Sequence, residues 1–292
     1  MQFGIIAITW QRPFLTDHLS LLEKIRALGF GLVEFAVEDE RHLDYGKAAR
    51  VLRETGLTCC ICTMLNPQRD LASDDPAARA GGKAYLKHCI DAVAEMGGRL
   101  VDGPVIGDPL YFAGRRATVR DPAEKARKRA LVVEGLREIG AYAAAKGVTV
   151  AVEPLNRFET ALLTTAAQAK DLIREVGSPA VRIHLDTFHM NVEEDSFAGA
   201  IRTAGSDLAQ FHANENHRGN PGEGHVPWGE VAAALREISY DGPVVMEPFR
   251  RPPVNLGTAA AHWHPPAPDE DARIARGLAT LKDHFCRAGY KV

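Results

Sequence analysis

Short apolar runs alternate with helix-like stretches along the whole chain. The apolar runs cover residues 3–9, 31–35, 57–63, 99–105, 148–152, 181–185, 208–211 and 243–246. They are rich in β-branched and large apolar residues, whereas the stretches between them place apolar residues at helical spacing. This alternation is typical of βαβ units that build a parallel sheet covered on both sides. We therefore predict an α/β fold of the (β/α)8 barrel type, with an extra C-terminal helix over 269–286.

Local signals set several element boundaries. Asp121 and Pro122 form a good helix start, and Gly147 is expected to end that helix. A long helix is predicted from Pro76 to Glu95. The long loop 106–120 follows the fourth predicted strand, where a barrel carries its chemistry, so it is either a lid over the site or a surface loop packed on the barrel.

Length and composition fit a single domain spanning residues 1–292. No linker or composition shift divides the 292 residues, and one α/β barrel needs roughly 250. The formal net charge of −3 lacks the basic balance that is usual for nucleic-acid enzymes, although a local basic patch is compatible with it. The N-terminus lacks the features of a secretion signal, no run is long enough to span a membrane, and the five cysteines form no disulfide framework. We expect a cytoplasmic protein.

Four of the predicted strands end on a residue that can bind a metal. The runs 148–152, 181–185, 208–211 and 243–246 lead to Glu153, Asp186, His212 and Glu247. The carboxyl ends of parallel barrel strands meet at one rim, so these side chains should converge there. Three carboxylates and one imidazole suit a hard divalent cation, with Mn²⁺ preferred and Mg²⁺ or Co²⁺ as alternatives. Each residue alone is more often a salt-bridge partner or a cap, so the prediction depends on the set.

The sequence around these residues resembles a known family. Residues 153–159 (EPLNRFE), 185–191 (LDTFHMN), 221–224 (PGEG) and 245–249 (VMEPF) are similar to segments of the D-tagatose 3-epimerase family of ketose 3-epimerases. The resemblance covers most of the chain and implies a xylose isomerase-like barrel. It makes Glu153, Asp186, His212 and Glu247 the metal ligands, and Glu153 and Glu247 also the catalytic acid/base pair. It places Glu159, His189 and Arg218 on the substrate.

The resemblance implies an enzyme that inverts free ketoses of the D-tagatose, D-psicose or L-ribulose type at C3, and that assembles as a homodimer or homotetramer. One part of the pattern departs from the family. The family commonly carries Gly-Glu-x-Asn-Arg after the histidine and one apolar residue, whereas this chain has Asn214 and His217 at two of those positions. The departure leaves the preferred ketose open.

Three other functions compete with this hypothesis. An aldose–ketose isomerase could use the same metal site with a single base. A metal nuclease on the same barrel would need further ligands, for which His184, His217 and His225 are candidates, but the acidic balance disfavours it. A sugar-binding protein without turnover would not need the acid/base role of Glu153.

Overall fold

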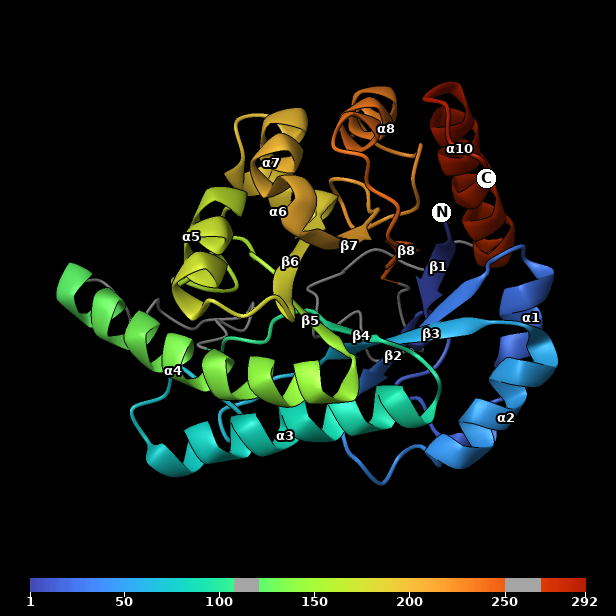
Figure 1. Cartoon of the computed structure of the whole chain (residues 1–292). Helices are drawn as coiled ribbons and strands as arrows, with labels where there is room; N and C mark the ends of the chain where they lie inside the picture. The colour runs from blue at the N-terminus through green and yellow to red at the C-terminus, as the bar shows by residue number, and fades with distance from the viewer. Residues whose placement is uncertain (108–120, 250–268) are drawn as a thin grey trace.

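Eight parallel strands close into a barrel in sequence order in the computed structural model (Figure 1). The structure describes residues 1–107, 121–249 and 269–292. Each strand pairs in parallel with the next, and the last closes on the first. The predicted barrel is therefore confirmed. Its strands are β1 (Phe3–Ile6), β2 (Leu32–Val37), β3 (Thr58–Thr63), β4 (Leu100–Asp102), β5 (Thr149–Val152), β6 (Val181–Asp186), β7 (Leu208–His212) and β8 (Val244–Met246).

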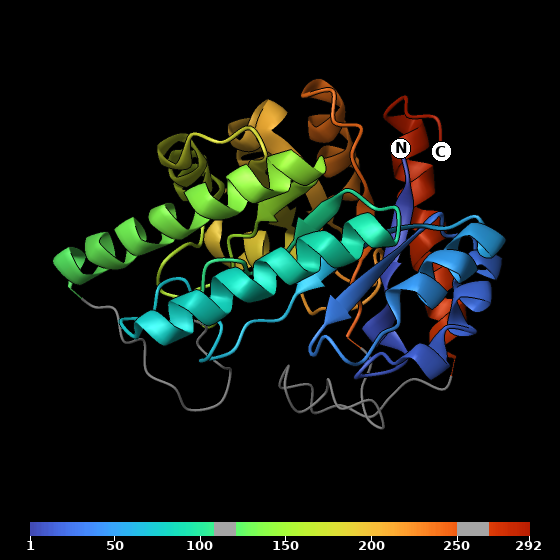
Figure 2. The same cartoon turned by 60° about the horizontal axis from the view of Figure 1, so that its bottom comes forward.

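Helices surround the barrel (Figures 1 and 2). The predicted C-terminal helix is present as α10, which packs beside β1 with the rings of Phe3 and Phe285 edge to face at 5.4 Å. No helix in the described ranges is long and apolar enough to cross a bilayer. The helices are α1 (Leu21–Ala27), α2 (Tyr45–Thr55), α3 (Pro76–Glu95), α4 (Pro122–Lys146), α5 (Ala166–Val176), α6 (Thr187–Glu193), α7 (Phe197–Ala204), α8 (Trp228–Glu237) and α10 (Glu270–Arg287).

The helix boundaries follow the local signals in the sequence. The carboxylate of Asp121 accepts a hydrogen bond from the N–H of Ala123, and Pro122 occupies the first turn of α4. Gly147 ends α4 in the left-handed conformation, at φ +65°. A side-chain oxygen satisfies a backbone donor that the first turn leaves without a partner, and glycine adopts positive φ without a steric penalty.

Three predictions about the strands were wrong in detail. Strand β1 ends at Ile6, and residues 7–9 form a 3-10 turn, because a continuous buried apolar run fits either conformation. Strand β4 ends at Asp102, because Gly103 takes φ +98°, outside the extended region. The second strand was predicted over residues 31–35, but β2 continues to Val37, so Glu34 lies within the barrel wall and not at its end.

The barrel interior changes character along its axis. Leu32, Cys60 and Val245 form a small apolar cluster inside the barrel. A layer of fully buried polar side chains also fills the interior, and we call it the interior polar layer: Glu34, Asp102, His184 and Gln210. Barrel interiors are usually filled by branched apolar residues. A polar layer at this depth therefore needs a specific physical reason.

Candidate active site

The four predicted ligand residues lie together at the carboxyl ends of the strands. Asp186 and His212 are the last residues of β6 and β7, and Glu153 and Glu247 directly follow β5 and β8. Glu153, Asp186 and His212 offer ligand atoms that all lie within 4.8 Å of one another. Glu247 Oε2 lies 3.5 Å from His212 Nδ1. We call these four buried residues the strand-end cluster.

Backbone and side-chain contacts orient three members of the strand-end cluster. The N–H of Glu153 donates to the carbonyl of Gly103 at 3.1 Å, which ties the end of β5 to the turn after β4. Asp186 caps α6 by accepting the N–H of Phe188 at 2.8 Å. The Nε2 atom of His212 lies 3.1 Å from Glu34 Oε1. A carboxylate on the second ring nitrogen fixes the orientation of a metal-binding histidine and increases its basicity.

Asn214 connects two members of the cluster. Its Nδ2 donates to both carboxylate oxygens of Asp186, at 3.1 and 3.2 Å. Its Oδ1 accepts the N–H of Glu247 at 2.8 Å. Thr187 holds the backbone of Asn214 in turn, since its hydroxyl donates to the Asn214 carbonyl at 2.6 Å. Asn214 is fully buried, so one of the two residues that depart from the family pattern takes part in building the site.

Arg218 lies among the carboxylates. Its Nη1 donates to Asp186 and, at 2.7 Å, to Glu247 Oε2. The guanidinium is sandwiched between the rings of Phe188 and Phe249, at 4.3 and 4.7 Å from their centres. Burial opposes its charge, but the carboxylates of Asp186 and Glu247 raise the pKa of Arg218. Arg218 is therefore the buried cation that partly balances the cluster, and its predicted contact with substrate stays a prediction.

The other two predicted substrate residues lie beside the cluster. Arg218 Nη2 donates to His189 Nε2 at 3.0 Å, and His189 Nε2 lies 3.5 Å from Glu153 Oε1. Burial, with Arg218 nearby, lowers the pKa of His189 to about 3, so the ring is neutral. Asn156 Nδ2 donates to Glu159 Oε1 at 2.8 Å. Burial raises the pKa of Glu159 to about 7.

The charges of the cluster favour a bound cation. Burial and the charge of Asp186 raise the pKa of Glu153. Burial disfavours the charged form of His212, but Glu34 and Glu247 outweigh it and raise the pKa of that ring. Carboxylates this close raise each other's pKa unless a positive charge lies between them. The buried oxygens of Glu153, Asp186 and Glu247 and a ring nitrogen of His212 fit the ligand preferences of Mn²⁺, Mg²⁺ and Co²⁺.

Sequence reasoning named His184 only as a candidate ligand of a nuclease site and missed the other members of the interior polar layer, Glu34, Asp102 and Gln210. Glu34 and Gln210 are joined by a hydrogen bond of 2.9 Å, and Glu34 contacts His212. The signal was available, because side chains two residues apart on a strand point to the same face. Gln210 precedes His212 by two residues and His184 precedes Asp186 by two, so all four point into the barrel.

The remaining predicted features lie elsewhere. His217 and His225 are exposed on the loop after β7, and His225 Nε2 lies 3.0 Å from Asn191 Oδ1. They do not extend the ligand set as a nuclease site would require. Residues 108–120 of the loop 106–120, predicted to be either a lid or a surface loop, lie outside the described residues.

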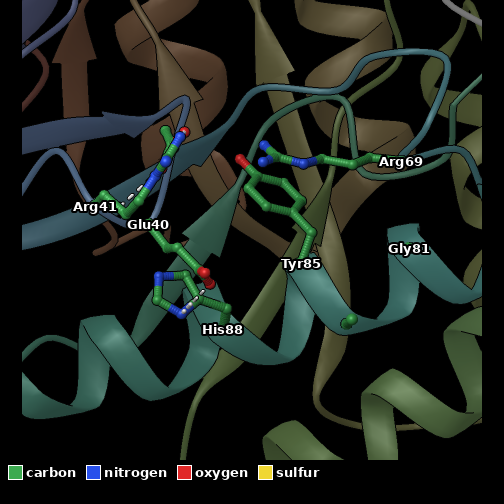
Figure 3. Close-up of a pocket in the computed structure, with 8 residues that line it drawn as sticks. Glu40, Arg41, Arg69, Gly81, Tyr85 and His88 are labelled. Atoms are coloured by element: carbon green, nitrogen blue, oxygen red, sulfur yellow. Dashed lines mark hydrogen bonds and ion pairs between the residues drawn. The ribbon is translucent and has the colours of Figure 1, made fainter.

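A surface hollow of about 440 Å³ lies between the loop after β2 and helix α3 (Figure 3). Its side chains mainly contact one another. Arg41 pairs with Asp39 at 2.6 Å, the guanidinium of Arg69 stacks over the ring of Tyr85 at 4.3 Å, and the Tyr85 hydroxyl donates to the Val37 carbonyl at 2.7 Å. None of the residues lining this hollow belongs to the strand-end cluster.

Comparisons with known proteins identify the family and relatives of this chain. A family model described as a xylose isomerase-like TIM barrel matches residues 22–284. A D-psicose 3-epimerase of Agrobacterium fabrum is 34% identical, covering 94% of this chain and 96% of the relative. An L-ribulose 3-epimerase of Mesorhizobium japonicum is 32% identical, covering 90% and 86%. The crystal structure of a D-psicose 3-epimerase in the presence of D-fructose superposes with a TM-score of 0.89 at 31% identity, covering 98% of this chain and 99% of that one.

Proposed function

This chain belongs to the xylose isomerase-like TIM barrel family, and from that membership we propose that it is a metal-dependent ketose 3-epimerase. The relatives that match nearly its whole length are isomerase-class enzymes named for this reaction. The observation that carries the proposal is the convergence of Glu153, Asp186, His212 and Glu247 at one end of the barrel. We propose that these four side chains hold a divalent cation, with Mn²⁺ preferred.

The reaction needs a weak carbon acid to lose a proton. The hydrogen on C3 of a ketose is next to the C2 carbonyl, but a carboxylate in water is too weak a base to remove it. When bound, a divalent cation supplies a Lewis acid that stabilises the negative charge developing on the sugar oxygens. Exclusion of water by the buried walls strengthens every electrostatic contribution in the site.

We propose that Glu153 and Glu247 are the two acid/base groups. One glutamate, ionised, takes the proton from C3; the C–H electron pair forms a C2–C3 double bond and the carbonyl pair moves onto the C2 oxygen. The other glutamate, protonated beforehand, then gives its proton to C3 from the opposite face while the C2 carbonyl forms again. The two residues follow β5 and β8, and strands β6 and β7 lie between them in the barrel wall. Such a separation suits approach from two sides of one sugar. Each acid–base step contributes roughly 10²–10⁴-fold to the rate.

Three residues are proposed to bind the sugar. His189 is neutral and lies 3.5 Å from Glu153 Oε1, which puts it within reach of a substrate oxygen beside that base. Glu159 lies on the same side, with His189 Nδ1 3.8 Å from its Oε1. Arg218 contacts Asp186 and Glu247, so its guanidinium lies beside the proposed metal ligands, where it would offer a positive charge to a substrate oxygen.

One experiment tests the reaction. The protein is loaded with Mn²⁺ and incubated separately with D-tagatose, D-fructose and L-ribulose in D₂O, and NMR locates the deuterium. We expect deuterium at C3 together with the C3-inverted ketose. Exchange at C1 with an aldose product would favour the isomerase, and no exchange with retained sugar binding would favour a binding protein.

Variants distinguish the catalytic roles of Glu153 and Glu247. Glu153→Gln and Glu247→Gln are each expected to abolish net epimerisation, because either change removes a proton carrier. If one variant still exchanges deuterium at C3 from one epimer alone, the remaining glutamate is the base for that face. Glu237→Gln, on the exposed end of α8, is the matched control and is expected to keep full turnover. Normal epimerisation by both site variants would refute the proposed roles.

A further inference from the structure

The interior polar layer contains buried groups without hydrogen bonds. In the described part of the chain, neither oxygen of Asp102 and neither ring nitrogen of His184 makes one, and Glu34 Oε2 makes none. All three residues are fully buried. Leaving such groups unsatisfied is unfavourable by several kcal/mol in general, so natural proteins rarely contain them without a ligand, water or ion nearby.

These groups face one another. Asp102 has ligand atoms within 4.8 Å of both His184 and His212, and it belongs to a second such group with Glu34 and Cys60. His184 Nδ1 lies 3.8 Å from Asp102 Oδ1, and His212 Nε2 lies 4.0 Å from the same oxygen. These separations are too long for hydrogen bonds. They are close to the roughly 3–4 Å expected between two atoms that bind the same metal ion at about 2.1 Å.

The interior polar layer is also acidic. Its buried carboxyl groups are Glu34 and Asp102, whereas the buried cation Arg218 lies beside Asp186 and Glu247 in the strand-end cluster. A buried carboxylate without a positive partner is strongly unfavourable, so a cation between these groups would stabilise the layer.

We infer that Asp102 is the centre of a second site for a divalent transition metal ion, inside the barrel and one layer below the strand-end cluster, with His184 and Glu34 as the other ligands near it. Glu153 lies between the two positions, since its Oε2 is 3.8 Å from His184 Nδ1 and its Oε1 faces His189. Oxygen and imidazole ligands suit Zn²⁺, Mn²⁺ or Co²⁺. The ion would hold Glu34, and through Glu34 the ring of His212.

Two further observations agree with this ligand set. Burial lowers the pKa of His184, so the ring is neutral and able to bind a metal. The Cys60 thiol donates to Glu34 Oε1 at 3.3 Å, and burial with Glu34 nearby raises its pKa. Cys60 therefore stays protonated and supports Glu34 instead of acting as a thiolate ligand.

The test counts and locates metal ions in the full chain. The protein is equilibrated with Zn²⁺, and gel filtration removes unbound metal. Elemental mass spectrometry then measures the zinc equivalents bound per chain. We expect two equivalents in the wild type and one in Asp102→Asn and in His184→Met. Asp186→Asn is the matched control: it removes a strand-end ligand and should also retain one equivalent, in the interior. Anomalous diffraction at the zinc edge then locates the ions in the wild type.

The outcomes decide the inference. A zinc peak between Asp102 and His184, with the loss of one equivalent in the interior variants, supports it. One equivalent in the wild type, with a single peak at the strand-end cluster, overturns it and leaves the epimerase proposal intact. Unchanged zinc content in Asp102→Asn also overturns it. If the interior variants do not fold, the position of the peaks in the wild type still decides.

Discussion

Asn214 offers a direct test of how the strand-end cluster is held together. Asn214→Ala removes an amide that donates to both oxygens of Asp186 and accepts the N–H of Glu247. A hydrogen bond to a charged group contributes about 1.5–3 kcal/mol, and a buried N–H left without a partner costs about 1–3 kcal/mol. Because Asn214 is fully buried, water replaces neither contact. We expect the free energy of unfolding to fall by about 3–5 kcal/mol.

The same change should weaken metal binding. Asp186 and Glu247 are proposed ligands, and loss of a residue that orients ligands typically lowers metal affinity about 10–100-fold. Unfolding of the metal-free protein in guanidinium chloride measures the change in the free energy of unfolding. Competition with a chelator for Mn²⁺ measures the change in metal affinity. Both measurements use the same preparation.

Asn216→Ala is the matched control for Asn214. Asn216 lies in the same loop and is half-buried, and its Oδ1 accepts the N–H of His225 at 3.2 Å. Its loss should cost less than about 1 kcal/mol and leave the Mn²⁺ affinity unchanged. If Asn214→Ala unfolds within 1 kcal/mol of the wild type and keeps its Mn²⁺ affinity, the network does not hold the cluster and the reasoning fails.

Two further predictions concern Glu159 and the turn after β4. Burial raises the pKa of Glu159 from 4.5 to about 7, so its contribution to the stability of the metal-free protein is fully present below pH 4.5 and is lost as pH rises through 7. By linkage this is roughly 3 kcal/mol, and denaturation at pH 5 and pH 8 should show a loss in the wild type that Glu159→Gln lacks; equal losses would contradict it. Gly103→Ala should destabilise by about 1–3 kcal/mol, because Gly103 has φ +98° and an added Cβ would lie 2.9 Å from Cys62 Sγ. Gly97→Ala is its control, because Gly97 has φ +85° and nothing lies within 4 Å of an added Cβ. An equal loss of stability in both variants would show that the contact of the added Cβ with Cys62 Sγ is unimportant.

The site was predictable to the extent that strand ends determine it. Glu153, Asp186, His212 and Glu247 each follow a short apolar run, and parallel strands in a closed barrel bring such ends together whatever the rest of the sequence is. The role of Arg218 was not predictable in the same way. It comes from a loop, at φ +59°, and reaches Asp186 and Glu247 only because that loop folds back over the barrel.

The sequence by itself determined the barrel, its order of strands and helices and the strand-end ligands, because these follow from periodicity and from short-range signals such as the caps of α4. Only the tertiary structure decided what lies beneath those ligands. Glu34, Asp102 and His184 come from strands β2, β4 and β6, and no local pattern states which inward side chains of distant strands occupy the same level. That level is set by the stagger of neighbouring strands in the closed barrel, which is a property of the whole sheet.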